Sequence, residues 1–196
     1  MKNLEKVISK IETELDEKDQ VREVALKSSR VVARLSGGIL RGLHRGADVK
    51  AEVRELKDEV SKLGSLLSEH PELESAGYVE GALQEYAEVC MVISLIEKGD
   101  VPSPEEIGVD SIPYILGLGD SVGELRRLCL SELKVGNVAR ANHFLEIMED
   151  MFAALMRFDY PEAIIPIRRK QDVARSVLEK TRGEVAVAAS ARNLQE

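Results

Sequence analysis

The chain has 196 residues, of which 44% are hydrophobic, so it is long enough for one well-buried domain, which we expect to span residues 1–196. No run approaches the length of a membrane span, and the N-terminal MKNLEKVISKIE lacks the apolar region of a signal peptide, so we expect a soluble, cytoplasmic protein without a membrane partner. The net charge of -8 does not exclude a polyanionic partner, because residues 20–50 and 165–182 are basic whereas residues 55–110 are strongly acidic.

Apolar residues recur at helical spacing throughout the chain, and strand-like alternation is scarce, so the sequence predicts an all-α bundle of six to seven helices. The six clearest helices are predicted over residues 4–44, 49–69, 72–98, 113–133, 138–158 and 168–188. Prolines and glycines mark the main breaks, in GDVPSPEEIGVDS and in DYPEAIIP. Pro113 is a good residue for the first turn of the fourth helix, after Ser111.

A basic stripe runs along the predicted first helix. At about 100° per residue its side chains lie within roughly 60° of one another and extend over about 27 Å. The stripe consists of Lys27, Arg30, Arg34, Arg41 and Arg45. A solvated face normally carries acidic partners four residues away, and this stripe has almost none. It therefore favours a polyanion, and its length suits the phosphates of a duplex, about one charge per 1.7 Å. Arg168 and Arg169, in the second basic segment, are further candidate contacts.

Two acidic pairs form the strongest chemical signal. Glu85 and Glu88 lie on the predicted third helix, and Asp120 and Glu124 lie on the fourth. Residues three or four apart share one face of a helix, so each pair presents two carboxylates to a single point. Oxygen-only sets of this kind suit Mg²⁺ or Mn²⁺. The four residues are therefore candidate metal ligands and catalytic groups, although ordinary solvated acids would give the same pattern.

The surroundings of both pairs favour the metal site. The apolar run after Glu88 predicts a buried helix, where a bare carboxylate costs several kcal/mol or more. The second pair is surrounded by Gly117, Gly119, Ser121 and Gly123. Each glycine inside a helix costs roughly 0.5–1 kcal/mol relative to alanine, so this set of small residues indicates close approach of another helix or a ligand.

The cysteines and histidines do not indicate another metal. Cys90 and Cys129 have apolar neighbours and no Cys-x-x-Cys spacing, so we expect reduced core residues. His44, His70 and His143 form no metal-ligand pattern, which argues against zinc and against a Glu-x-x-His di-iron bundle.

Several strings resemble the translin/Trax family of all-α nucleic-acid-binding proteins, and none of them is a generic helix pattern. The resemblance covers nearly the whole chain and is clearest in GALQEYAEV, YILGLGDSVGELRRLCL, RRKQDVARSVLEKTRGEV and LRGLHRG. It implies a translin-like fold of about seven helices that assembles into a hollow octamer with RNA against its inner wall. In Trax-type subunits a carboxylate cluster cleaves RNA with Mg²⁺, and its Glu-x-x-Glu and Asp-x-x-x-Glu match the two acidic pairs here. The chain resembles a compact Trax-like member.

The sequence therefore favours a Mg²⁺-dependent endoribonuclease (a metal-dependent hydrolase) that acts as a homo-oligomer, with Mn²⁺ as an alternative ion. Glu88 and Asp120 are expected to bind the metal directly, and Glu85 and Glu124 to be further ligands or to orient the attacking water. With no Trp and few other aromatic residues, recognition should follow shape and phosphate. The apolar segments 89–96 and 144–158 are expected to supply surface for contacts between subunits.

Two alternatives remain open. The first is a non-catalytic protein of the translin type that binds single-stranded RNA or DNA and keeps the carboxylates as structure. The second is an all-α nucleoside triphosphate pyrophosphohydrolase, which also uses acidic pairs on two helices with Mg²⁺. A small nucleotide does not need so long a basic stripe, which disfavours the second alternative.

Overall fold

The computed structural model describes residues 2–193, which form seven α-helices, one turn of 3-10 helix and no strand. The elements are α1 (Lys2–His44), α2 (Lys50–Glu69), η1 (Pro71–Leu73), α3 (Gly77–Lys98), α4 (Pro104–Ile107), α5 (Ser111–Lys134), α6 (Val138–Leu155) and α7 (Arg168–Asn193). The predicted all-α class is confirmed. No helix in this range is long and apolar enough to cross a membrane.

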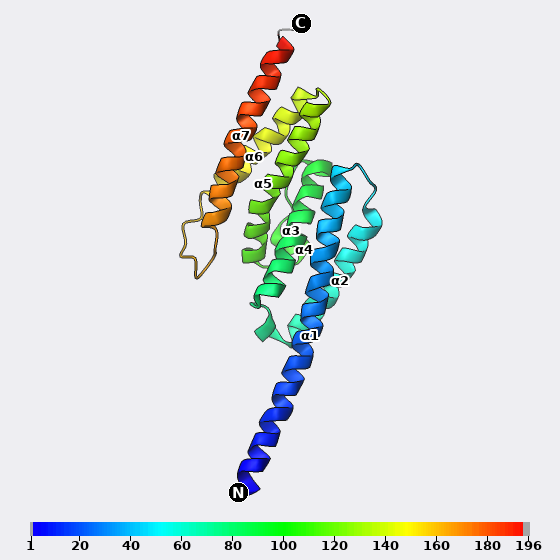
Figure 1. Ribbon diagram of the computed structural model, residues 1–196, viewed down its shortest axis with the longest axis vertical. Coiled ribbons are helices and arrows are strands. Elements are labelled where there is room, and N and C mark those ends of the chain that lie inside the picture. Colours follow the sequence, from blue (N-terminus) through cyan, green and yellow to red (C-terminus); the bar gives the residue numbers. More distant parts are fainter. Residues whose placement is uncertain (1, 194–196) are drawn as a thin grey trace.

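The helices α3 and α5 occupy the middle of the bundle. On one side α3 packs against α1, which also packs against α2, and on the other side α3 packs against α5. Helix α5 in turn contacts α6 and α7 (Figure 1). The N-terminal part of α1 and the C-terminal part of α7 extend beyond the bundle at opposite ends of the molecule. The two acidic pairs therefore lie on the two central helices.

The predicted helix boundaries differ from the structure mainly at the start of α3, in the expected loop 99–111 and at the ends of α6 and α7, which were expected at residues 158 and 188 and lie at Leu155 and Asn193. The third helix was expected from residue 72, but Pro71–Leu73 is a separate 3-10 turn, and Ala76 has an extended backbone before α3 begins. The expected loop 99–111 contains α4, which a capping box between Ser103 and Glu106 stabilises. Gly99 and Gly108 have positive φ values of 74° and 67°, which end α3 and α4.

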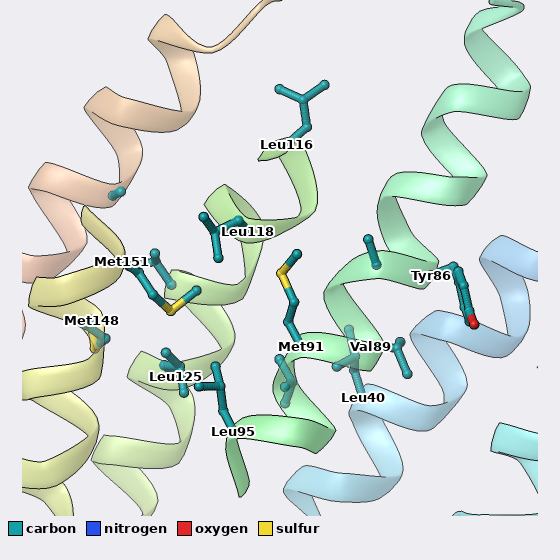
Figure 2. Close-up of a cluster of buried hydrophobic side chains, with 14 of the residues drawn as sticks. Leu40, Tyr86, Val89, Met91, Leu95, Leu116, Leu118, Leu125, Met148 and Met151 are labelled. Atoms are coloured by element: carbon teal, nitrogen blue, oxygen red, sulfur yellow. The ribbon is translucent and has the colours of Figure 1, made fainter. Parts of the chain in front are cut away.

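Most buried apolar side chains form one continuous core to which α1, α2, α3, α5, α6 and α7 all contribute. Figure 2 shows Met91 and Leu95 of α3 pointing toward Leu118 and Leu125 of α5, with Met148 and Met151 of α6 on the side of α5 away from α3. Burying each such side chain contributes about 1.5–3 kcal/mol. This packing holds α3 and α5 side by side along the length that carries the acidic residues.

The expectation of spare apolar surface on segments 89–96 and 144–158 was wrong except at Met156, which is 42% exposed. Val92 and Met148 have no exposed surface, because these segments form the centre of the chain's own core. The exposed apolar side chains lie instead mainly in the N-terminal part of α1 and between the end of α6 and α7. On α1 a stripe of five such residues is 45–58% exposed, namely Leu4, Val7, Ile8, Ile11 and Leu15.

Candidate functional site

The two acidic pairs come together because α3 and α5 approach closely at Gly117. A Cβ atom added to Gly117 would lie 2.8 Å from the carbonyl oxygen of Gln84 and 3.1 Å from the backbone nitrogen of Glu88. A side chain at this position would force the two helix backbones apart. The glycine thus permits the contact that places Glu85 and Glu88 beside the acidic residues of α5.

The other small residues of α5 have different neighbours. A Cβ atom on Gly119 would lie 2.9 Å from the Cβ of Lys170 on α7. Ser121 is fully buried, and its hydroxyl lies 3.7 Å from Sδ of Met91 on α3. The predicted close approach is therefore confirmed at these three positions. It is wrong at Gly123, where an added Cβ would meet nothing within 4 Å.

Glu88 lies at the centre of the acidic cluster. Burial is the main cause that raises the pKa of its carboxyl group to about 8, and the negative charges of Asp120, Glu124 and Glu85 also raise it. Burial and the charge of Asp120 raise the pKa of Glu85 as well. Lys170 is the neighbour that lowers the pKa of Glu88. The four predicted carboxylates therefore share one electrostatic environment.

Both carboxylate oxygens of Asp120 accept hydrogen bonds from other helices. The ammonium group of Lys170 on α7 lies 2.5 Å from Oδ1, and the side-chain amide of Gln84 on α3 lies 2.5 Å from Oδ2. These bonds tie α5 to its two neighbours through a single carboxylate. The charge-assisted bond from Lys170 is the stronger kind, because both of its partners are ionisable.

Glu124 is similarly occupied and is only 7% exposed. Its Oε2 pairs with Nε2 of His44 at the end of α1, and its Oε1 forms an ion pair with the guanidinium of Arg127 at 2.9 Å. Glu85 and Glu88, by contrast, have neither a hydrogen bond nor an ion pair from their side chains within residues 2–193. The side chains of Glu85 and Glu88 on α3 thus have no hydrogen-bond or ion-pair partner in this range, whereas Asp120 and Glu124 on α5 are each paired with basic residues.

These basic partners were not predicted from the sequence as parts of the site. Lys170 is 50 residues from Asp120, and His44 is 80 residues from Glu124, so no local spacing links them. Arg127 was the one detectable partner, because it lies three residues after Glu124 on the same helix face. Its position in GELRRLCL could have identified it.

The donor set fits a divalent cation, although no three acidic, histidine or cysteine side chains of the described residues converge as a ready-made metal site. The physical reason is that Lys170, Gln84, His44 and Arg127 already engage the two α5 carboxylates. The four carboxylates still form an oxygen-only set of ligands, which Mg²⁺ and Mn²⁺ prefer, and two of them have no hydrogen-bond or ion-pair partner in the described range. A cation there would offset the repulsion and burial that raise the pKa of Glu88. The metal ligands stay a prediction.

The basic stripe of α1 is exposed along its length and leads to this cluster. None of its five side chains forms an ion pair with another residue in the described range, which agrees with the lack of acidic partners in the sequence. At its C-terminal end, a shallow depression of about 400 Å³ is lined by Arg41, His44, Arg45 and Arg127 among others. Because His44 and Arg127 contact Glu124, the stripe reaches the edge of the carboxylate cluster.

The second basic segment divides into two parts. Lys170 points to the cluster, whereas Arg168 and Arg169 are exposed and line a separate shallow depression with Asp172 and Val173. Another cavity of about 390 Å³ lies between α2, α3 and the α4 region, and none of the four carboxylates lines it. The candidate chemistry is therefore at the α3–α5 contact and not in that cavity.

Fold and site together define a class: an all-α protein with a carboxylate cluster between two central helices and an exposed basic helix that leads to it. The sequence model of the Translin family matches residues 4–185. An uncharacterized protein of Methanocaldococcus jannaschii is 37% identical over 175 residues, which are 87% of this chain and 78% of that protein. The chain belongs to the Translin family, and the predicted resemblance is confirmed.

Solved structures give the same fold. The chain resembles apo-NeC3PO with a TM-score of 0.82 and 24% identity, covering 92% of this chain and 96% of the other, a likeness that supports the fold alone. AfC3PO has a TM-score of 0.79 and 30% identity over 94% of this chain and 98% of its own. A complex of AfC3PO with duplex RNA has a TM-score of 0.78 and 28% identity, covering 96% and 99%.

Proposed function

We propose that this protein is a divalent-cation-dependent endoribonuclease that acts as a homo-oligomer. The observation that carries the proposal is the meeting of the basic stripe with the carboxylate cluster. Arg41 and Arg45 share a depression with His44 and Arg127, and the latter two contact Glu124. A nucleic-acid backbone lying on α1 would thus bring a phosphate to the acidic groups.

Membership of the Translin family supports an RNA ligand, as does the complex of the similar AfC3PO with duplex RNA. The chain has no Trp and only three Phe and four Tyr, so few side chains are available to stack on bases. Binding should therefore rest on phosphates and shape, and should depend little on base sequence. Single-stranded DNA is a possible further ligand on the same grounds.

In this mechanism Glu85, Glu88, Asp120 and Glu124 would hold Mg²⁺ or Mn²⁺, which would polarise the scissile phosphate and lower the pKa of an attacking water. The residues of the chain supply the rest. Basic side chains of the α1 stripe bind the phosphates on either side of the scissile bond and fix the backbone in place. Arg127 orients Glu124 from one side while His44 holds it from the other.

The non-catalytic alternative does not explain why Glu85 and Glu88 lie unpaired, within the part of the chain that the structure describes, at this part-buried position. A structural carboxylate at a part-buried position should be paired, because burying a charge without a partner is costly. The side chains of both residues have no partner among residues 2–193, and burial raises the pKa of both. Their arrangement therefore favours a function that uses their free oxygens.

Self-association is the second part of the proposal, and we propose the octamer that the family resemblance implies. Eight chains of 21.7 kDa would give a mass of about 174 kDa. The exposed apolar stripe Leu4, Val7, Ile8, Ile11 and Leu15 supports association, because an isolated amphipathic helix of this length is marginal in water. This stripe replaces the two core segments as the expected contact surface.

The decisive experiment incubates the full-length protein with end-labelled single- and double-stranded RNA of several lengths, with Mg²⁺, Mn²⁺ or EDTA. We expect internal cleavage only with a divalent cation. Glu88→Gln and Asp120→Asn should abolish cleavage and retain RNA binding, whereas Glu97→Gln, an exposed acid on the same helix as Glu88, should behave as wild type. RNA binding without cleavage under every condition would support the non-catalytic alternative. Hydrolysis of nucleoside triphosphates without RNA cleavage would support the pyrophosphohydrolase.

A further inference from the structure

Among the described side chains of α7, Lys170 is the basic residue that reaches the carboxylates. Its ammonium nitrogen lies 2.5 Å from Oδ1 of Asp120, and its charge also acts on Glu88. Both partners of the ion pair are partly buried, with side-chain exposures of 25% for Lys170 and 30% for Asp120. The ammonium group thus supplies positive charge where the oxygens of α3 and α5 face one another.

The surrounding residues place Lys170 there. A Cβ atom on Gly119 would lie 2.9, 3.3 and 3.6 Å from Cβ, Cγ and Cδ of Lys170, so the aliphatic part of the lysine lies directly across α5 at this glycine. The next residue, Gln171, is buried and donates hydrogen bonds to the carbonyls of Leu155 and Phe158 at 2.9 and 2.8 Å. These bonds fasten the start of α7 to the end of α6.

We propose that Lys170 is a built-in competitor for the divalent cation, and that cation binding moves its ammonium group from Asp120 to a phosphate of the bound RNA. The proposal rests on the proposed function of the same site. An ammonium group and a divalent cation cannot occupy the same side of one carboxylate oxygen. The lysine can leave without moving α7, because its charge sits on a flexible four-carbon chain.

The proposal has a measurable consequence for cation affinity. A ligand that binds only when Lys170 is displaced has an affinity reduced by the fraction of molecules in the displaced state. Charge-assisted hydrogen bonds are strong enough to make that fraction about one in ten or less. Removing the ammonium group should therefore tighten cation binding about tenfold or more, while a phosphate contact is lost.

The first test measures Mn²⁺ binding to the full-length protein by the loss of the free-ion signal in electron paramagnetic resonance. Lys170→Met should bind Mn²⁺ about tenfold more tightly than wild type and cleave RNA with a lower kcat/KM. Lys180→Met is the matched control, because Lys180 is exposed on the same helix, and it should leave both quantities unchanged. Unchanged or weaker Mn²⁺ binding in Lys170→Met would mean that Lys170 is only a structural ion pair.

The second test uses the wild-type protein, so it does not depend on the folding of a variant. An amine-reactive reagent is applied with and without Mg²⁺, and the labelling rates of Lys170 and Lys180 are compared by mass spectrometry. If Mg²⁺ increases the labelling rate of Lys170 and not that of Lys180, the cation displaces Lys170 from Asp120. If the labelling rate of Lys170 is the same with and without Mg²⁺, the proposal is wrong. Neither test requires RNA cleavage. If the protein does not cleave RNA, the proposed function fails, but the cation-binding and labelling results still decide whether Lys170 competes for Asp120.

Discussion

The contact at Gly117 gives a quantitative prediction, because it is where the two halves of the carboxylate cluster meet. Gly117→Ala places a methyl group 2.8 Å from the carbonyl oxygen of Gln84 and 3.0 Å from the Cβ of Ala87. Ordinary van der Waals contacts begin near 3.4 Å, so α3 and α5 must separate by about 0.6 Å. Neither neighbouring atom is the end of a flexible side chain, so the strain cannot be relieved by a change of rotamer.

The expected change in stability follows from two opposing effects. Overpacking a core contact costs about 1–3 kcal/mol. Replacing glycine by alanine inside a helix contributes about 0.5–1 kcal/mol in the other direction. The net result for Gly117→Ala should be a loss of about 1–2 kcal/mol in the free energy of unfolding. Gly123→Ala, on the same helix but facing open space, should show only the gain.

Urea denaturation of both variants at one protein concentration checks this difference, since association makes apparent stability depend on concentration. The variants should differ by about 2 kcal/mol, with wild type between them. RNA cleavage by Gly117→Ala should also fall, by up to about 100-fold, because catalytic groups displaced by a fraction of an ångström lose their alignment. If Gly117→Ala proves as stable as Gly123→Ala, the α3–α5 contact at Gly117 is not tight, and Gly117 does not position the carboxylates.

Three further predictions concern charge and assembly. In EDTA the carboxyl group of Glu88 has a pKa of about 8 in the folded protein against an ordinary 4.5, so the stability that its protonated form contributes below pH 4.5 is lost as pH rises through 8. The free energy of unfolding of Glu88→Gln at pH 9 should therefore be higher than that of wild type, by at most about 5 kcal/mol. Equal urea midpoints of the two proteins at pH 9 would contradict this. Changing Arg30, Arg34 and Arg41 to Gln should flatten the salt dependence of RNA affinity by about 0.7–0.9 per lost phosphate contact in a log–log plot; an unchanged slope would remove the stripe from the interface. Ile11→Glu should lower the mass measured by light scattering, whereas an unaltered assembly would exclude the α1 stripe as a contact surface.

Most of the fold could be predicted from the sequence, because apolar residues recur with the helical period along the whole length of a long amphipathic helix. The expected limits of α1, α2 and α5 lie within two residues of the observed ones. The start of α3 was predicted too early because Pro71 suits the first turn of a helix but opens only a 3-10 turn, whereas α3 itself begins at Gly77. The short α4 was missed because four residues are too few to show a helical period.

The candidate site could be predicted only in part, because several of its residues contact partners that are far away in the sequence. Pairs on one helix, such as Glu85 with Glu88, are visible as spacings. The contact between Lys170 and Asp120 depends on how α7 packs on α5, and no single helix contains that information. The same limit applies to His44 and Glu124, which join the end of α1 to the middle of α5.

The boundary between the acidic cluster and the basic stripe explains how one surface can serve both a cation and a polyanion. Four carboxylates alone would repel an RNA phosphate, at about 1 kcal/mol per pair of charges 4 Å apart even in water, and by more in a partly buried site. His44 and Arg127 stand between the two regions and bind Glu124, so the negative field is weakened on the side that faces the stripe. Lys170 performs the same role from α7 at Asp120. The α3 pair has no direct basic partner among residues 2–193, and burial together with the neighbouring carboxylates raises the pKa of Glu88 to about 8 although Lys170 lowers it in part. A divalent cation that replaced the proton on Glu88 and the Lys170 contact would make the cluster less repulsive toward phosphate, so RNA affinity should rise, and not only cleavage begin, when Mg²⁺ is added at constant ionic strength.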